Sequence, residues 1–285
     1  MRSRLFSLTA LPLALAGHLL FWAGSATMLR SAQTFSGLDV AAIALVAVGI
    51  LVTLAAIATV VIGSLGAYLV GAALLLFSLL VHLLPISGAS PAFALIGVVR
   101  SGSWATSDGM FFYFPPGVGA VVGALFVAAA VAADRRRGAE PSTRGRALSA
   151  LTAIVGLGGL LLALVMGWSV YADLLVILQP PSPLDIVLLY LGAVLVAAPV
   201  VAAMRSSAGA IIAGSVVVAG AIFELASPWA LAGAQIDPFL RRGIDFAGPS
   251  GELLLIGLLM VVAGFAVRVR GRRNRVVQHT ATITD

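Results

Sequence analysis

The feature that most constrains the fold is a long stretch without charge. Between Val40 and Val99 the sequence contains no Asp, Glu, Arg or Lys. A single helix over residues 40–86 alone would be about 70 Å long at roughly 1.5 Å per residue, more than twice the roughly 30 Å of a bilayer's hydrocarbon core. The chain must therefore fold back, and Gly63-Ser64-Leu65-Gly66 contains the residues that break a helix most readily. This stretch predicts two adjacent membrane-spanning helices.

The composition extends this prediction to the whole chain. Of the 285 residues, 61% are hydrophobic and 10% are charged, whereas a soluble domain carries about 25% charged residues. Apolar runs long enough to cross a bilayer recur throughout the sequence. We therefore predict an all-α fold, a polytopic transmembrane helical bundle. Its eight helices are expected at about 5–29, 38–60, 64–86, 115–133, 147–170, 184–204, 208–226 and 251–268.

The first of these runs also resembles a secretory signal peptide. The letters MRSR precede it, and AGSA near its end resembles a cleavage site. The run is about 25 residues long, however, whereas the apolar region of a signal peptide has about 7–15. We therefore predict that it is retained as the first transmembrane helix.

The arginines predict the orientation of the chain. All 17 basic residues are arginines, and most flank apolar runs, as the positive-inside rule describes. With the N-terminus inside and eight alternating spans, all but four of them lie on the inner side; the exceptions are Arg30, Arg100, Arg241 and Arg242. This bias predicts a protein of a bacterial-type plasma membrane with both termini in the cytoplasm. The expected partners are the lipid bilayer and, at the cytoplasmic face, anionic lipid.

The amino-acid composition and the motifs that the sequence lacks exclude several classes of protein. The formal net charge of +6 is explained by arginines at the ends of the spans, so it does not indicate a nucleic-acid partner. The absence of cysteine excludes disulfides, thiolate metal sites and a Cys-x-x-Cys redox centre. The signatures of a Walker loop, a Gly-x-Ser-x-Gly elbow and a His-Glu-x-x-His zinc site are missing as well. No catalytic residue, metal or cofactor is therefore predicted.

The two halves of the sequence resemble each other. The segment SGLDVAAIAL begins at Ser36, and SPLDIVLLYL begins at Ser182. An even number of spans lets the second half repeat the first in the same orientation, so we predict a parallel tandem repeat of a four-helix unit. Convergent composition is the alternative, because alanine and leucine matches are common in such a chain. The weight therefore rests on rare residues, which pair as Trp22–Trp168, Asp39–Asp185, Ser64–Ser206 and Arg100–Arg242.

This duplication defines the expected domains. The first four-helix unit comprises residues 1–133 and the second comprises residues 147–270. A basic cytoplasmic linker over 134–146, with the sequence DRRRGAEPSTRGR, joins them. Residues 271–285 are expected to form a disordered cytoplasmic tail.

Three acidic residues stand where a loop enters a helix, namely Asp39, Asp185 and Glu252. A carboxylate at such a place can accept the free N–H groups of the first turn and interacts favourably with the positive end of the helix dipole. We therefore interpret all three as helix-capping, structural residues.

The candidate ligand-binding residues are ionisable side chains in or beside the spans. His18 lies near the middle of the first span, where an ionisable group is a functional candidate, although a neutral histidine can instead bond to a helix carbonyl. His82 and Glu224 occupy matching places near the outer ends of the third and seventh helices. They could pair, bracket a cationic ligand, or simply be hydrated at the interface.

The two outer loops supply the remaining candidates. Arg100 and Arg242 hold matching places there, where positive charge runs against the bias of the chain. They could bind an anionic partner or pair with nearby Asp108, Asp237 or Asp245. The apolar segment 91–99 is too short to span a bilayer, so it either lies on the membrane surface or dips in and returns.

The sequence leaves three classes of function open. The scarcity of polar groups at depth favours a non-catalytic subunit or scaffold of a membrane assembly, with other membrane subunits or a second copy of the chain as its partners. The duplication and the outer residues favour a transporter of a small or lipid-like substrate, with an outward-facing site at the repeat interface. An outer-face lipid-modifying enzyme is the third class, supported by the same outer residues alone.

Overall fold

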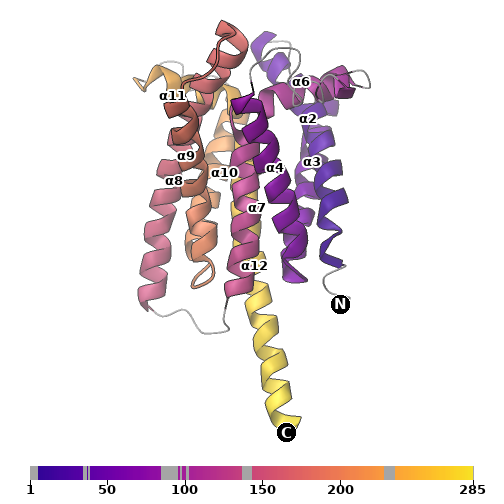
Figure 1. Ribbon diagram of the computed structural model, residues 1–285, viewed down its shortest axis with the longest axis vertical. Helices are drawn as coiled ribbons and strands as arrows, with labels where there is room; N and C mark the ends of the chain where they lie inside the picture. The colour runs from indigo at the N-terminus through magenta and orange to yellow at the C-terminus, as the bar shows by residue number, and fades with distance from the viewer. Residues whose placement is uncertain are drawn as a thin grey trace.

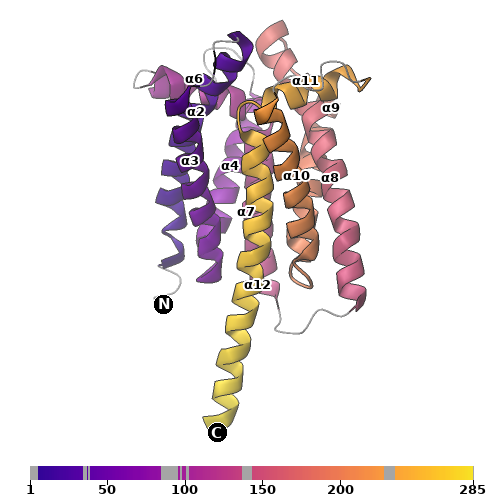
Figure 2. The same ribbon diagram turned by 180° about the vertical axis from the view of Figure 1, so that it is seen from behind.

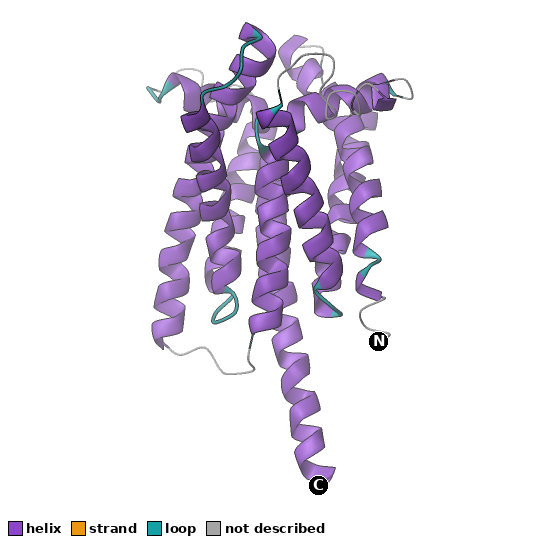
Figure 3. Cartoon of the chain, viewed as in Figure 1, coloured by secondary structure: helices purple, strands orange, loops and turns teal. Residues whose placement is uncertain are grey.

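The structure is a computed structural model and describes residues 6–34, 37, 39–84, 96, 98–100, 103–136, 143–227 and 235–284. These residues form helices and connecting turns without any strand (Figure 3). Eight helices are long and apolar enough to cross a membrane: Ala10–Thr34, Val40–Val61, Leu65–Leu83, Val118–Arg135, Ala147–Ile177, Pro183–Ala202, Ala208–Ala226 and Glu252–Asn274. The prediction of an all-α, multi-pass membrane protein with eight spans is confirmed. Most of the segment 91–99 lies outside the described residues.

The helices of the first half begin with α2 (Ala10–Thr34) and α3 (Val40–Ala58). A 3-10 turn over Thr59–Val61 ends α3, and α4 (Leu65–Leu83) then returns across the membrane. The chain therefore reverses at the glycine-rich turn, where the sequence predicts the break. A short helix, α6 (Trp104–Tyr113), precedes the last span of this half, α7 (Val118–Arg135).

The helices of the second half follow the same order. They begin with α8 (Thr143–Tyr171), which a π-helical turn over Ala172–Ile177 extends. The spans α9 (Pro183–Ala202) and α10 (Ala208–Ala226) follow. A short helix, α11 (Pro238–Ala247), precedes the last helix, α12 (Glu252–Thr284).

The last helix is longer than the sequence predicts. We expected disorder from residue 271, but α12 continues as a helix to Thr284. Extending an existing helix adds a hydrogen bond for each residue fixed, so a run without proline continues readily. Gly271 also lies against the Arg136 side chain, where an added Cβ would come within 2.5 Å of Nε and 2.7 Å of Cδ.

The spans form two groups around a central pair. In Figure 1, α2, α3 and α4 lie to one side, α8, α9 and α10 lie to the other, and α7 and α12 stand between them. The reverse view in Figure 2 gives the same arrangement. The short helices α6 and α11 lie across one end of the bundle, hereafter the α6/α11 end. The beginning of α2 and the end of α12 lie at the opposite end.

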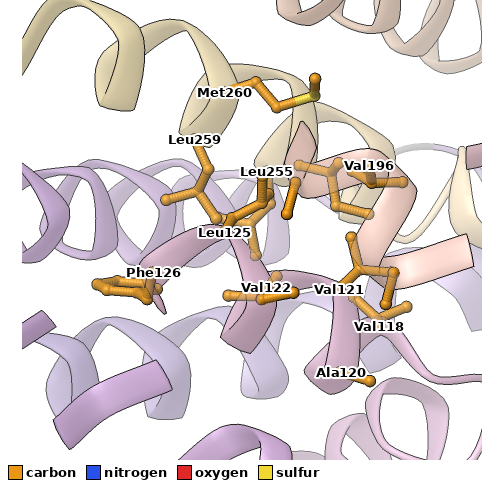
Figure 4. Close-up of a cluster of buried hydrophobic side chains, with 14 of the residues drawn as sticks. Val118, Ala120, Val121, Val122, Leu125, Phe126, Val196, Leu255, Leu259 and Met260 are labelled. Atoms are coloured by element: carbon orange, nitrogen blue, oxygen red, sulfur yellow. The ribbon is translucent and has the colours of Figure 1, made fainter. Parts of the chain in front are cut away.

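The centre of the bundle is tightly packed and apolar. Every buried residue of α7 is apolar or glycine. Side chains of α12 meet those of α7 in Figure 4, and Val196 of α9 joins them. Leu125, Leu255 and Leu259 in this cluster are fully buried. Between Glu252 at its beginning and Arg268, α12 carries no polar side chain.

Glycines allow α4 to approach α7 and α10 to approach α12. A Cβ atom added to Gly71 of α4 would lie 2.6 Å from the carbonyl oxygen of Gly123 in α7. A Cβ added to Gly214 of α10 would lie 2.6 Å from the carbonyl oxygen of Gly257 in α12. Backbones that come this close are typical of small-residue interfaces in membranes. The two helix pairs thus pack through the same kind of contact.

Each half also contacts the other at the turns that precede α7 and α12. Gly117 and Gly251 occupy these turns with φ of 81° and 83°, a left-handed conformation that suits glycine. A Cβ on Gly117 would meet the side chain of Leu189 in α9, and a Cβ on Gly251 would meet the side chain of Val46 in α3. The last span of each half therefore begins against the second span of the other half.

Arginines make a second pair of contacts between the halves, at the end of the bundle opposite α6 and α11. Nη1 of Arg136 donates to the carbonyl oxygen of Ala203 at 2.6 Å, and Nη1 of Arg270 donates to that of Val60 at 2.8 Å. Each acceptor lies just after a second span, where a helix leaves carbonyl groups without intrahelical partners. The two arginines thus satisfy carbonyl groups that the helices cannot.

Candidate functional site

The three acidic residues at helix beginnings differ in what they do. Asp39 is the N-cap of α3, and its Oδ1 accepts hydrogen bonds from the backbone N–H groups of Ala41 and Ala42 at 2.9 and 3.1 Å. Asp185 does not cap α9, because Ser182 occupies the N-cap and Pro183 begins the helix. The Asp185 carboxylate instead accepts a hydrogen bond from the hydroxyl of Ser169 at 2.8 Å.

Glu252 is fully buried in the first turn of α12. Neither of its carboxylate oxygens forms a hydrogen bond within the described part of the chain, because the nearby Ser250 hydroxyl donates instead to the carbonyl oxygen of Ala247 at 3.2 Å. It therefore occupies the favourable end of the helix dipole without acting as the hydrogen-bonding cap that the sequence predicted. A buried polar group without a partner is costly, so Glu252 becomes a residue that needs an explanation.

His18 is held in one tautomer by its neighbours. Its Nδ1 lies 2.7 Å from the carbonyl oxygen of Ala14, which can only accept, so Nδ1–H donates there. The Tyr113 hydroxyl then donates to Nε2 over 3.0 Å. Burial, reinforced by the charge of Glu252, raises the pKa of Tyr113 well above its usual range, so this hydroxyl keeps its proton. Both ring nitrogens of His18 are satisfied, which favours a structural role.

His82 is satisfied in a similar way. Its Nε2 donates to the carbonyl oxygens of Phe114 and Pro115 at 3.1 and 3.0 Å, and its Nδ1 accepts from the hydroxyl of Tyr190 at 3.2 Å. Pro115 and Pro116 have no backbone N–H and interrupt the helical pattern here, and the Phe114 carbonyl oxygen also accepts a hydrogen bond from the backbone N–H of Gly117 at 2.9 Å. His82 thus joins α4 both to the turn before α7 and to α9 of the other half.

Glu224 is the exception among the predicted candidates. The side chain is 3% exposed, and neither carboxylate oxygen has a hydrogen-bond partner in the described structure. Its Cβ lies against Gly248, where an added Cβ would come within 2.9 Å. The charged group that acts on Glu224 is Asp245 of α11, which is also a carboxylate. The sequence placed His82 and Glu224 at matching positions, yet no hydrogen bond or ion pair joins them among the described residues.

Asp245 is only partly compensated. Nε of Arg241, one turn earlier in α11, lies 3.6 Å from Oδ2 of Asp245, while Oδ1 is buried and has no hydrogen-bond partner in the part of the chain that the structure describes. Burial raises the pKa of Asp245, and the nearby guanidinium of Arg241 opposes this shift. Within the described ranges, Glu224 and Asp245 together contribute three buried carboxylate oxygens that have no hydrogen-bond donor.

The outer arginines face aromatic rings. The guanidinium carbon of Arg100 lies 3.7 Å from the ring centre of Trp104, and that of Arg242 lies 5.8 Å from the ring centre of Trp168. Both distances fit cation–π contacts. Asp108 pairs with Arg30 instead of Arg100. Arg241 and Arg242 also line a cavity of about 510 Å³ at the α6/α11 end, together with Gln33, Trp168, Ile236, Pro238, Asp245 and Phe246.

Two apolar grooves run along the spans. One lies between α2 and α4, has a volume of about 360 Å³, and is lined by apolar side chains together with His18 and Trp22. The other lies between α8 and α10, has a volume of about 380 Å³, and is lined by apolar residues with Glu224 as its only ionisable group. Each groove therefore combines an apolar wall with a polar residue.

No known protein family, curated protein or solved structure matches this chain. The site must therefore be interpreted from its own chemistry. No cluster of three or more His, Asp or Glu side chains that could hold a metal ion occurs in the described ranges. Among the described residues, the buried side-chain atoms without hydrogen-bond partners are the indole nitrogen of Trp22, the hydroxyl of Ser78 and the carboxylate oxygens of Glu224, Asp245 and Glu252. The carboxylates lie at the α6/α11 end, and their chemistry suits a hydrogen-bond donor or a cation.

Proposed function

We propose that this protein is a non-catalytic subunit or scaffold of a membrane assembly, built from two parallel four-helix units. The units are residues 1–133 and 147–270, joined by the linker 134–146. The observation that carries this function is the packed, apolar centre formed by α7 and α12. Parallel-repeat transporters place their sites near the midplane at the interface between the repeats. Among the described residues, the packed centre between α7 and α12 presents only apolar side chains and glycine to a solute.

The paired contacts between the halves support the repeat. Gly117 and Gly251 are 134 positions apart, as are Arg136 and Arg270. Their partners are 143 positions apart in both cases, Val46 with Leu189 and Val60 with Ala203. Contacts that recur reciprocally are characteristic of an isologous interface around a two-fold axis.

These contacts imply a different alignment of the second half on the first half from the one that the rare residues suggest. Gly109 of α6 packs against the carbonyl of Trp22, and Gly243 of α11 packs against the carbonyl of Leu164. In this alignment Trp22 corresponds to Leu164 instead of Trp168. The N-cap Asp39 likewise corresponds to the N-cap Ser182, which explains why Asp185 does not cap.

A lipid transporter is the second candidate. The observation that favours it is the pair of apolar grooves, one between the first and third helices of each proposed unit. An apolar substrate would not require a polar path across the centre. The outer-face lipid-modifying enzyme has less support, because both ring nitrogens of His82 are occupied by structural hydrogen bonds.

The subunit proposal is tested by extracting the protein, at its native expression level, into polymer-bounded membrane discs. Native mass spectrometry should then find the chain at a fixed ratio with other membrane subunits or with a second copy. A chain that remains a monomer, and that moves fluorescent lipid between leaflets after reconstitution, would overturn the proposal in favour of the transporter.

The orientation is a separate prediction, tested by single cysteines in this cysteine-free chain. In the proposed topology Ser142 lies in the cytoplasmic linker, and Gln179 lies in the exposed outer turn between α8 and α9. Ser142→Cys should resist an impermeant maleimide in intact cells and react after permeabilisation, whereas Gln179→Cys should react in both. The reverse pattern would show that the chain is inserted the other way round.

A further inference from the structure

The groove between α8 and α10 has the form of a binding site for one lipid chain. Its walls include Leu160, Leu161 and Leu164 of α8 together with Val216, Gly220 and Phe223 of α10. Several of these side chains, such as Leu161 and Phe223, are exposed on the membrane-facing surface. A volume of about 380 Å³ lies within the roughly 300–1,000 Å³ that small-molecule sites occupy. A bilayer lipid can enter it from the side.

The polar end of the groove is formed by a side chain of the protein itself. Glu224 is almost fully buried and lines the groove, and neither of its oxygens has a hydrogen-bond donor among the described residues. Leaving such a group unpartnered in an apolar setting is costly. Asp245 adds a further buried oxygen without a donor. A ligand with several N–H donors and a positive charge would compensate all three oxygens.

The depth of the groove matches one leaflet. From Val216 to Glu224 the α10 wall rises about 12 Å at roughly 1.5 Å per residue. Half of a hydrocarbon core of roughly 30 Å is about 15 Å. Glu224 lies toward the α6/α11 end of this wall, so a chain in the groove would point its head toward that end and its tail toward the midplane.

We propose that this groove binds one acyl chain of an aminophospholipid from the leaflet at the α6/α11 end, with the primary ammonium group at Glu224. The charges around it complement such a zwitterionic head. Asp245, beside Glu224, also lines the cavity of about 510 Å³ at the α6/α11 end, where Arg241 and Arg242 supply guanidinium groups. Guanidinium groups bind phosphate through paired hydrogen bonds. The carboxylates thus face the ammonium group while the arginines face the phosphate.

The groove between α2 and α4 provides an internal comparison. It has nearly the same volume and is equally apolar. Its ionisable residue, His18, already has partners on both ring nitrogens. This groove therefore offers an acyl chain the same walls but offers an ammonium group no acceptor. Headgroup selectivity is expected at Glu224 alone.

The test compares headgroups in nanodiscs of defined composition, with lipid retention measured by native mass spectrometry. Phosphatidylethanolamine should be retained as one tightly held molecule per chain, about ten- to a hundred-fold more strongly than phosphatidylcholine. Phosphatidylcholine carries the same charges but its quaternary ammonium has no N–H donor. Equal retention of the two, or strongest retention of phosphatidylglycerol, would overturn the assignment to an ammonium group.

Two variants locate the site and share one control. Glu224→Gln keeps the shape of the side chain but removes the charge, and it should abolish the preference for phosphatidylethanolamine. Gly220→Leu should fill the groove, because a Cβ at Gly220 meets no atom within 4 Å, and it should abolish retention altogether. Gly158→Leu, at an equally open position outside the groove lining, should leave retention unchanged. Undiminished selective retention in Gly220→Leu would overturn the proposal even if Glu224→Gln failed to fold.

Discussion

The variants Gly71→Leu and Gly214→Leu are each expected to lower the apparent Tm of the purified protein by a large and similar amount. In each case a new side chain would have to fit where a Cβ lies 2.6 Å from a carbonyl oxygen and 2.9 Å from a backbone nitrogen of the neighbouring span. Overpacking a core costs about 1–3 kcal/mol, occasionally more. Because backbone atoms cannot rotate away, we expect about 3 kcal/mol or more, which corresponds to roughly 10 °C.

The similarity of the two effects tests the proposed repeat as well as the packing. The measurement is thermal unfolding in one detergent, with Gly158→Leu as the control, because a Cβ there meets no atom within 4 Å. The control should stay close to the parent. A large loss at Gly71 with none at Gly214 would contradict the equivalence of the α4–α7 and α10–α12 interfaces.

The spans were predictable from the sequence because crossing a membrane imposes a minimum length of apolar residues. This requirement is local, so hydropathy and the turn at Gly63–Gly66 were sufficient to place all eight. The helical continuation of α12 was not predictable in this way. It depends on a long helix that is already formed, and its arginine-rich sequence has the composition of a solvated tail.

The proposed alignment of the two halves rests on contacts between residues that are distant in the sequence. Trp22 and Trp168 attract attention because tryptophan is rare, but identity at one position does not establish equivalence in space. The informative residues are glycines such as Gly71 and Gly214, which are too common in this chain to be noticed in the sequence. Their significance appears only when the backbone that each one approaches is known.

The candidate site was predictable as a set of residue types and not as an arrangement. Ionisable side chains within the spans drew attention to His18, His82 and Glu224 as candidates. Whether each is satisfied depends on partners far along the chain, such as Tyr113 for His18 and Tyr190 for His82. Glu224 differs from both because no such partner reaches it within the described structure. A sequence alone cannot distinguish a satisfied buried group from an unsatisfied one.

Replacing Glu252 by leucine is expected to stabilise the protein. Glu252 is fully buried, and its carboxylate has no hydrogen-bond partner among the described residues. Burying a polar group in this state costs about 1–3 kcal/mol by mutational measurements. Leucine is similar in volume and has no polar atom to desolvate. Glu252→Leu should therefore raise the apparent Tm by several degrees in a thermal melt, with Glu252→Gln showing whether charge or shape dominates.

The proposed first unit provides the reciprocal variant. Val118 follows the left-handed Gly117 as Glu252 follows the left-handed Gly251, and it is buried as well. Val118→Glu should destabilise the protein by about 3 kcal/mol or more, because it introduces a larger, polar group without a partner. If Glu252→Leu instead lowered the Tm, the carboxylate would have to be compensated by a bound group. If the variant is more stable but assembles less well in the cell, Glu252 is retained for function at the expense of stability.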